Sequence, residues 1–248
     1  MKKKHILTAA LSVAAAIMLF WYAAVPDAIV PQMISNRVGD LGVSVEAQGF
    51  HKGLFLNFSA DTLDIKYGGK LAVRLDNLQG HISPLSLLLL KVRMPFHSGV
   101  SGGDIDGVFA YGLLSGKKDI KTLISNVQVG RIPAVKDRLQ GILNARLEFA
   151  GERGQFVYKM EGMKGFPYDF TSSNGVLDLS MKDIRIKSVS LDSDWAYARM
   201  KGSITGGFYD LKTEVMPHSA SYNYMLAQYE VSPGYYVIPA SGRLQELL

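Results

Sequence analysis

The chain has 248 residues, of which 48% are hydrophobic and 20% charged, a composition that excludes a disordered protein and permits a sizeable core. Its net charge of +5 includes Lys2, Lys3 and Lys4, and the remainder holds 24 Lys and Arg against 22 Asp and Glu. This near-neutral body has no basic stripe, which argues against nucleic-acid binding. The absence of cysteine excludes disulfides, thiol nucleophiles and Cys-based metal sites.

The N-terminal segment predicts a single membrane anchor. After the lysine cluster, residues 6–25 carry no charge, and about 20 apolar residues suffice to cross the hydrocarbon core. The positive-inside rule places the lysines in the cytoplasm. We therefore expect residues 1–27 to form a cytoplasmic cluster and transmembrane helix, and residues 28–248 a periplasmic domain. The expected anchor residues are Ile6, Leu7, Leu11, Val13, Ile17, Leu19, Phe20, Trp21 and Tyr22.

A cleaved signal peptide is the alternative to an anchor. The apolar stretch is longer than the usual core of such a peptide, and Phe20-Trp21-Tyr22 stands where small residues would approach a cleavage site. Ala23-Ala24 keeps cleavage open. Both interpretations export the rest of the chain, and the anchor predicts a single-pass protein of a bacterial inner membrane.

Beyond an expected short amphipathic helix over residues 31–40, the hydrophobic pattern changes to a period of two. Strict alternation is typical of antiparallel strands with one apolar face. The clearest alternating segments are residues 71–76, 145–149, 156–161, 177–182 and 209–215. These segments predict a mainly β protein, with a long antiparallel sheet curled into a groove or an incomplete barrel.

Three Gly-Gly pairs and one Asn-Gly pair indicate the turns between these strands: Gly68-Gly69, Gly102-Gly103, Asn174-Gly175 and Gly206-Gly207. A brief helix is expected over residues 132–139, with Pro133 in its first turn. The run Leu85–Leu90 is too short for a second span, and predicts a buried strand or a short helix.

The apolar side of the alternating strands is the candidate binding surface. An open apolar trough would bind acyl chains, whereas the same side chains could instead fill a packed core. The residues expected to line it are Leu71, Val73, Leu75, Leu147, Phe149, Leu177, Leu179, Leu211 and Val215.

Signatures of catalysis are missing from the sequence. The five histidines form no metal-binding spacing and are interpreted as scattered surface or turn residues. Asp104-Ile105-Asp106 lacks the further ligands of a calcium loop, and Ile105 is expected to point inward between two outward carboxylates. No Gly-x-Ser-x-Gly elbow or nucleotide-binding motif is present. We expect no catalytic residue, metal or cofactor.

Several short segments occur in the same order as in a known family. They are Gly49–Leu56, Leu75–Ser86, Ser101–Gly107, Gly202–Ile204 and Gly242–Leu244. Together with the N-terminal span, they make the chain resemble the type II secretion system protein N (GspN) family, itself related to AsmA-like and lipid-transport-like β-groove proteins. This resemblance implies a non-enzymatic, inner-membrane protein whose partners are the membrane and other type II secretion components. The alternative function is AsmA-like binding or transport of lipid or lipopolysaccharide in the apolar groove.

Overall fold

The computed structural model describes residues 43–53, 56–136, 138–165, 170–180, 183–219 and 226–243. The predicted anchor and the expected helix over residues 31–40 lie outside these ranges. Within them, no helix is both long and apolar enough to cross a bilayer. The described chain is mainly β, with antiparallel strands of up to twelve residues, which confirms the predicted class. It divides into two compact units, one made of the described residues up to 122 with 131–134, and the other of the described residues in 123–130 and from 135 onward.

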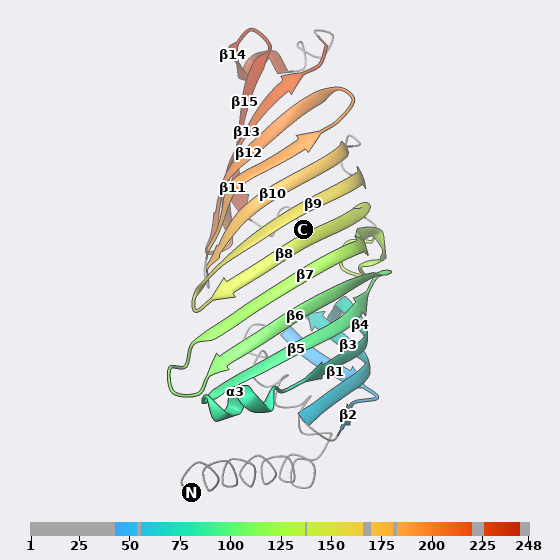
Figure 1. Ribbon diagram of the computed structural model, residues 1–248. Helices are drawn as coiled ribbons and strands as arrows, with labels where there is room; N and C mark the ends of the chain where they lie inside the picture. Colours follow the sequence, from blue (N-terminus) through green and yellow to red (C-terminus); the bar gives the residue numbers. More distant parts are fainter. Residues whose placement is uncertain are drawn as a thin grey trace, which may run out of the picture. The chain divides into compact units, whose positions relative to one another are not determined.

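The first unit has the strand order β1-β3-β4-β5-β6, with β2 also paired to β3 (Figure 1). Its elements are β1 (Val43–Gln48), β2 (His51–Lys52), β3 (Asn57–Tyr67), β4 (Lys70–His81), α3 (Pro84–Leu88), β5 (Lys91–Val100) and β6 (Gly103–Gly112). The strand β7 (Lys118–Gln128) contributes residues 118–122 to this unit and 123–128 to the second.

The second unit is a succession of neighbouring strands, β8-β9-β10-β11-β12-β13-β15-β14 (Figure 1). The bounds are β8 (Gln140–Ala150), β9 (Arg153–Lys164), β10 (Phe170–Ser180), β11 (Asp183–Asp192), β12 (Ala196–Thr205), β13 (Phe208–Pro217), β14 (Glu230–Ser232) and β15 (Tyr235–Arg243). Two 3-10 turns are also described, η3 (Val129–Arg131) and η5 (Ala227–Tyr229), although Arg131 is grouped with the first unit.

Two of the local predictions are wrong. Asn174-Gly175 is not a turn but lies in the middle of β10. Gly175 pairs with Tyr158 of β9, and a Cβ at this glycine would overlap the tyrosine ring. The glycine is therefore explained by a cross-strand contact. The described residues among 132–139 form no regular helix, and Arg138 and Leu139 instead donate backbone hydrogen bonds to the Val135 carbonyl in a turn.

Aromatic rings cover glycines on neighbouring strands in four places. The pairs are Phe58–Gly80, Phe96–Gly107, Phe149–Gly154 and Tyr158–Gly175. A glycine leaves the backbone open, and a neighbouring ring can then cover it and restore apolar contact. Glycine in these strands therefore serves packing, while Gly68-Gly69 and Gly206-Gly207 form the predicted turns.

Candidate functional site

The second unit carries one continuous apolar face, which the strand register defines. Directly paired residues of antiparallel strands place their side chains on the same side of the sheet. Starting from Phe149, Leu147, Ala145 and Leu143 on β8, four rows of paired residues cross from β8 to β15.

We call these four rows the apolar face. The first row is Phe149, Gly154, Leu179, Ile184, Ile204, Tyr209 and Gly242. The second is Leu147, Phe156, Leu177, Ile186, Gly202, Leu211 and Ala240. The third is Ala145, Tyr158, Gly175, Val189, Met200, Thr213 and Ile238. The fourth is Leu143, Met160, Ser173, Leu191, Ala198, Val215 and Tyr236.

A bulge in β11 keeps this face continuous. Ile186 and Val189 are three residues apart, yet their partners on β12, Gly202 and Met200, are only two apart. The extra residue corrects the alternation, so both side chains lie on the apolar face, where both are buried. The reverse side holds charged residues, including the ion pairs Arg146–Glu148, Lys159–Glu161 and Lys187–Asp178. Apolar and charged side chains therefore lie on opposite faces of the sheet in this unit.

Burial decreases across the apolar face from the fourth row to the first. Tyr236 is fully buried with Ala196, Ala198 and Val215, and Trp195, Leu226 and Tyr229 pack against this cluster. In the third row, burial raises the pKa of Tyr158, although its hydroxyl is 3.1 Å from the Ser173 hydroxyl. In the first row, every residue is only partly buried. The fourth row thus belongs to a packed core, whereas the first row keeps accessible apolar surface.

Six of the nine predicted groove residues lie together on this face. Leu147, Phe149, Leu177, Leu179 and Leu211 belong to the two more accessible rows, and Val215 belongs to the packed core. Val73 and Leu75 lie in the first unit, paired with Ile65 and Leu63. Leu71 leaves their row, because a bulge shifts the register and places it opposite Lys66. The alternation over residues 71–76 gave no sign of this bulge.

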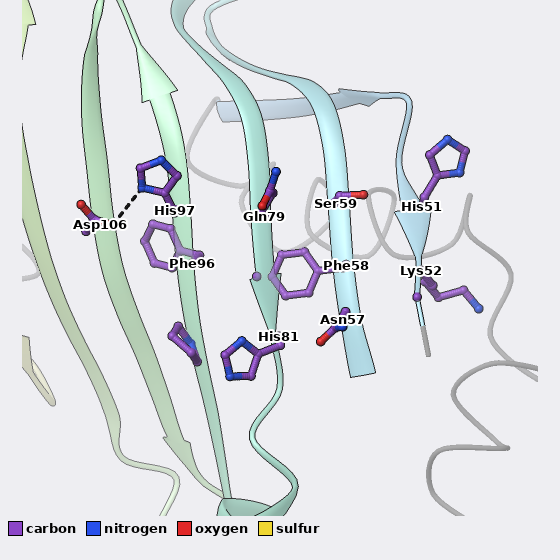
Figure 2. Close-up of a pocket in the computed structure, with 13 residues that line it drawn as sticks. His51, Lys52, Asn57, Phe58, Ser59, Gln79, His81, Phe96, His97 and Asp106 are labelled. Carbon is purple, nitrogen blue, oxygen red and sulfur yellow. Dashed lines mark hydrogen bonds and ion pairs between the residues drawn. The ribbon is translucent and has the colours of Figure 1, made fainter. Parts of the chain in front are cut away.

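The first unit contains a different feature, a pocket of about 720 Å³ with polar and aromatic lining residues, shown in Figure 2. Three histidines line it, His51 from β2, His81 from β4 and His97 from β5. The prediction that histidines lie at the surface is confirmed for these three, but they are not scattered, since strand pairing gathers them. His97 Nδ1 lies 2.8 Å from an Asp106 carboxylate oxygen.

The remaining lining groups of this pocket include the uncharged hydrogen-bonding side chains of Asn57, Ser59 and Gln79 and the aromatic rings of Phe58 and Phe96. As expected, Asp104 and Asp106 are exposed on either side of the less accessible Ile105. No group of three or more His, Asp or Glu residues in the described part of the chain is arranged to hold a metal ion.

An ion pair within the first unit shifts the pKa values of both its partners. Arg74 donates two hydrogen bonds to the buried Asp64 carboxylate, from Nε at 2.6 Å and from Nη2 at 2.7 Å. These bonds, outweighing the opposing effect of burial, lower the pKa of Asp64, while they raise that of Arg74. Asp64 lies on β3 and Arg74 on β4, so the pair joins two neighbouring strands.

Comparisons of the chain with family models, with curated proteins and with solved structures find no match.

Proposed function

We propose that this chain is a non-enzymatic protein, anchored in the inner membrane, whose periplasmic part binds lipid acyl chains on the apolar face of the second unit. The observation that carries the proposal is the decrease of burial across that face. Two of its four rows hold partly accessible Leu, Ile and Phe side chains, and every residue of the first row is only partly buried. Such a face would act as the predicted groove.

The dimensions and composition of the accessible rows suit an acyl chain. Neighbouring strands lie about 4.8 Å apart, so a row that crosses seven strands is roughly 29 Å long. Burial of each methylene contributes about 0.8 kcal/mol, which favours a long saturated chain over a small polar ligand. The predicted anchor would hold this face close to a supply of lipid.

A photocrosslinking experiment tests acyl-chain binding. Benzoylphenylalanine is placed at Leu177 on the apolar face, or at its neighbour Val176 on the reverse side as the matched control. The full chain is irradiated in cells, purified and analysed by mass spectrometry. We expect lipid adducts at Leu177 at least fivefold above those at Val176. Equal yields at the two positions, or none at either, would show that the face does not bind lipid.

We also propose a second function, a role as an accessory component of type II secretion, supported by the sequence resemblance. Three of its segments, residues 49–56, 75–86 and 101–107, belong to the first unit and follow one another along β2, β4 and β6. A clean deletion should then reduce export of folded proteins across the outer membrane, measured as exoprotein activity in the medium. Normal secretion by the deletion strain would refute this role without bearing on lipid binding.

A further inference from the structure

Six leucines of the first unit are exposed in two neighbouring loops, at the ends of strands. Leu85, Leu88, Leu89 and Leu90 come from α3 and the turn after it, and Leu113 and Leu114 from the turn after β6. Leu114 is 83% exposed, Leu85 75% and Leu89 73%. We call these six residues the leucine patch. The prediction of a short helix at Leu85–Leu90 is confirmed, but the segment is not buried.

Hydrogen bonds hold the two loops together and satisfy their polar atoms. Leu113 N–H donates to the Leu90 carbonyl at 2.9 Å, which joins one loop to the other. Within the first loop, the Ser86 hydroxyl donates to the Ser83 carbonyl at 2.7 Å and accepts from the Arg93 N–H at 3.2 Å. In the second, Gly112 N–H donates to the Lys117 carbonyl at 2.9 Å. The leucines are therefore presented by a structured support.

One leucine of the leucine patch adopts an unusual backbone conformation. Leu90 has φ of 54°, in the left-handed region that bulky residues rarely occupy. In this conformation Leu90 precedes β5 with its side chain 48% exposed. This left-handed residue ends α3, since the Leu89 and Leu90 N–H groups donate to the Ser86 and Leu87 carbonyls, and it leaves the Leu90 side chain at the surface.

The charges around the leucine patch identify its partner. Residues 84–93 and 112–119 contain four cations, Lys91, Arg93, Lys117 and Lys118, and a single acidic residue, Asp119. All four cations are exposed. Exposed leucines combined with Lys and Arg are typical of segments that enter the boundary between acyl chains and anionic headgroups. A protein partner would not require this charge bias.

We propose that the leucine patch inserts into the surface of an anionic lipid bilayer, as a second membrane contact besides the predicted anchor. Leu85, Leu89 and Leu114 enter the acyl region, and the cations bind headgroup phosphates. This contact would set the first unit against the membrane surface. This membrane contact does not depend on acyl-chain binding by the second unit. The two proposals concern different residues, and their experiments place probes at different positions.

Because the chain has no cysteine, a single introduced cysteine can be labelled at a chosen position. The full chain carrying Leu114→Cys or Leu89→Cys is labelled with an environment-sensitive fluorophore and placed in nanodiscs of phosphatidylcholine with 30% phosphatidylglycerol. Acyl chains brominated near the headgroup serve as quenchers. The matched control is Leu123→Cys on β7, an exposed leucine outside the patch. We expect at least twofold stronger quenching at Leu114 and Leu89 than at Leu123.

Two further measurements separate the bilayer from other partners. Replacing phosphatidylglycerol by phosphatidylcholine, or introducing Lys91→Glu, Lys117→Glu and Lys118→Glu together, should reduce quenching at Leu114 by half or more. Quenching equal to that at Leu123 would overturn the proposal. So would fluorescence transfer between labels at Leu114 of two copies without lipid quenching, which would assign the leucine patch to self-association.

Discussion

At two positions, Gly175 and Asp64, a side chain on the neighbouring strand determines which residue fits. Gly175 lies opposite Tyr158, which is also within 3.1 Å of Ser173 through its hydroxyl. Asp64 is buried, and its charge is compensated by Arg74 on the neighbouring strand. In both cases a cross-strand neighbour decides which side chain the position accepts.

At Gly175, we expect Gly175→Ala to lower the free energy of unfolding by about 1–3 kcal/mol, since the new methyl group would displace the Tyr158 ring. Chemical denaturation of the full chain in detergent measures the change. In a Tyr158→Ala background the same substitution should cost much less. Equal costs in the two backgrounds would show that the ring contact is not responsible.

The ion pair of Asp64 with Arg74 predicts that part of the protein's stability is lost at low pH. The hydrogen bonds from Arg74 lower the pKa of Asp64 in the folded state below the value of about 3.9 in the unfolded chain. The resulting stabilisation is fully present above about pH 4 and is lost as the pH falls through the lowered folded-state pKa. Asp64→Asn should therefore be less stable than the natural chain at pH 7, and the difference should shrink in denaturation series below pH 4. A constant difference would contradict this.

At the scale of elements, the strands β12, β13 and β15 close one end of the second unit around Tyr236. This side chain is fully buried, and its hydroxyl has no hydrogen-bond partner among the described residues. Burial, followed by the charge of Glu230, raises its pKa. The aromatic ring, not the hydroxyl, therefore accounts for the packing of these strands.

We expect Tyr236→Phe to leave the free energy of unfolding unchanged or to raise it slightly, because it removes a buried hydroxyl that lacks a described partner. Tyr236→Ala should lower it by about 3–5 kcal/mol, since it opens a cavity beside Val215 and Ala198. Thermal and chemical unfolding compare the two variants. A large loss in Tyr236→Phe would mean that the hydroxyl is hydrogen-bonded in solution.

For the whole molecule, the charge of the N-terminal segment predicts the orientation in the membrane. Alkaline phosphatase fused after Leu248 should be active, and green fluorescent protein at the same position should be dark, because the C-terminus is expected in the periplasm. Replacing Lys2, Lys3 and Lys4 by Glu should lower phosphatase activity several-fold. If the green fluorescent protein fusion is fluorescent and the alkaline phosphatase fusion is inactive, the C-terminus lies in the cytoplasm.

The sequence by itself determined the mainly β class and the positions of β4, β8, β9, β10 and β13, because one-sided burial leaves a period of two in the hydrophobic pattern. It also placed six of the nine groove residues on one face, since regular strands preserve that alternation.

Tertiary structure decided the rest. A bulge moved Leu71 out of its row, a ring from β9 made Gly175 a packing position, and pairing of β2, β3, β4 and β5 gathered three distant histidines. Leu85 and Leu88–Leu90 remained exposed, contrary to their hydropathy. Register and burial depend on which strand lies opposite, and periodicity within one strand does not contain that information.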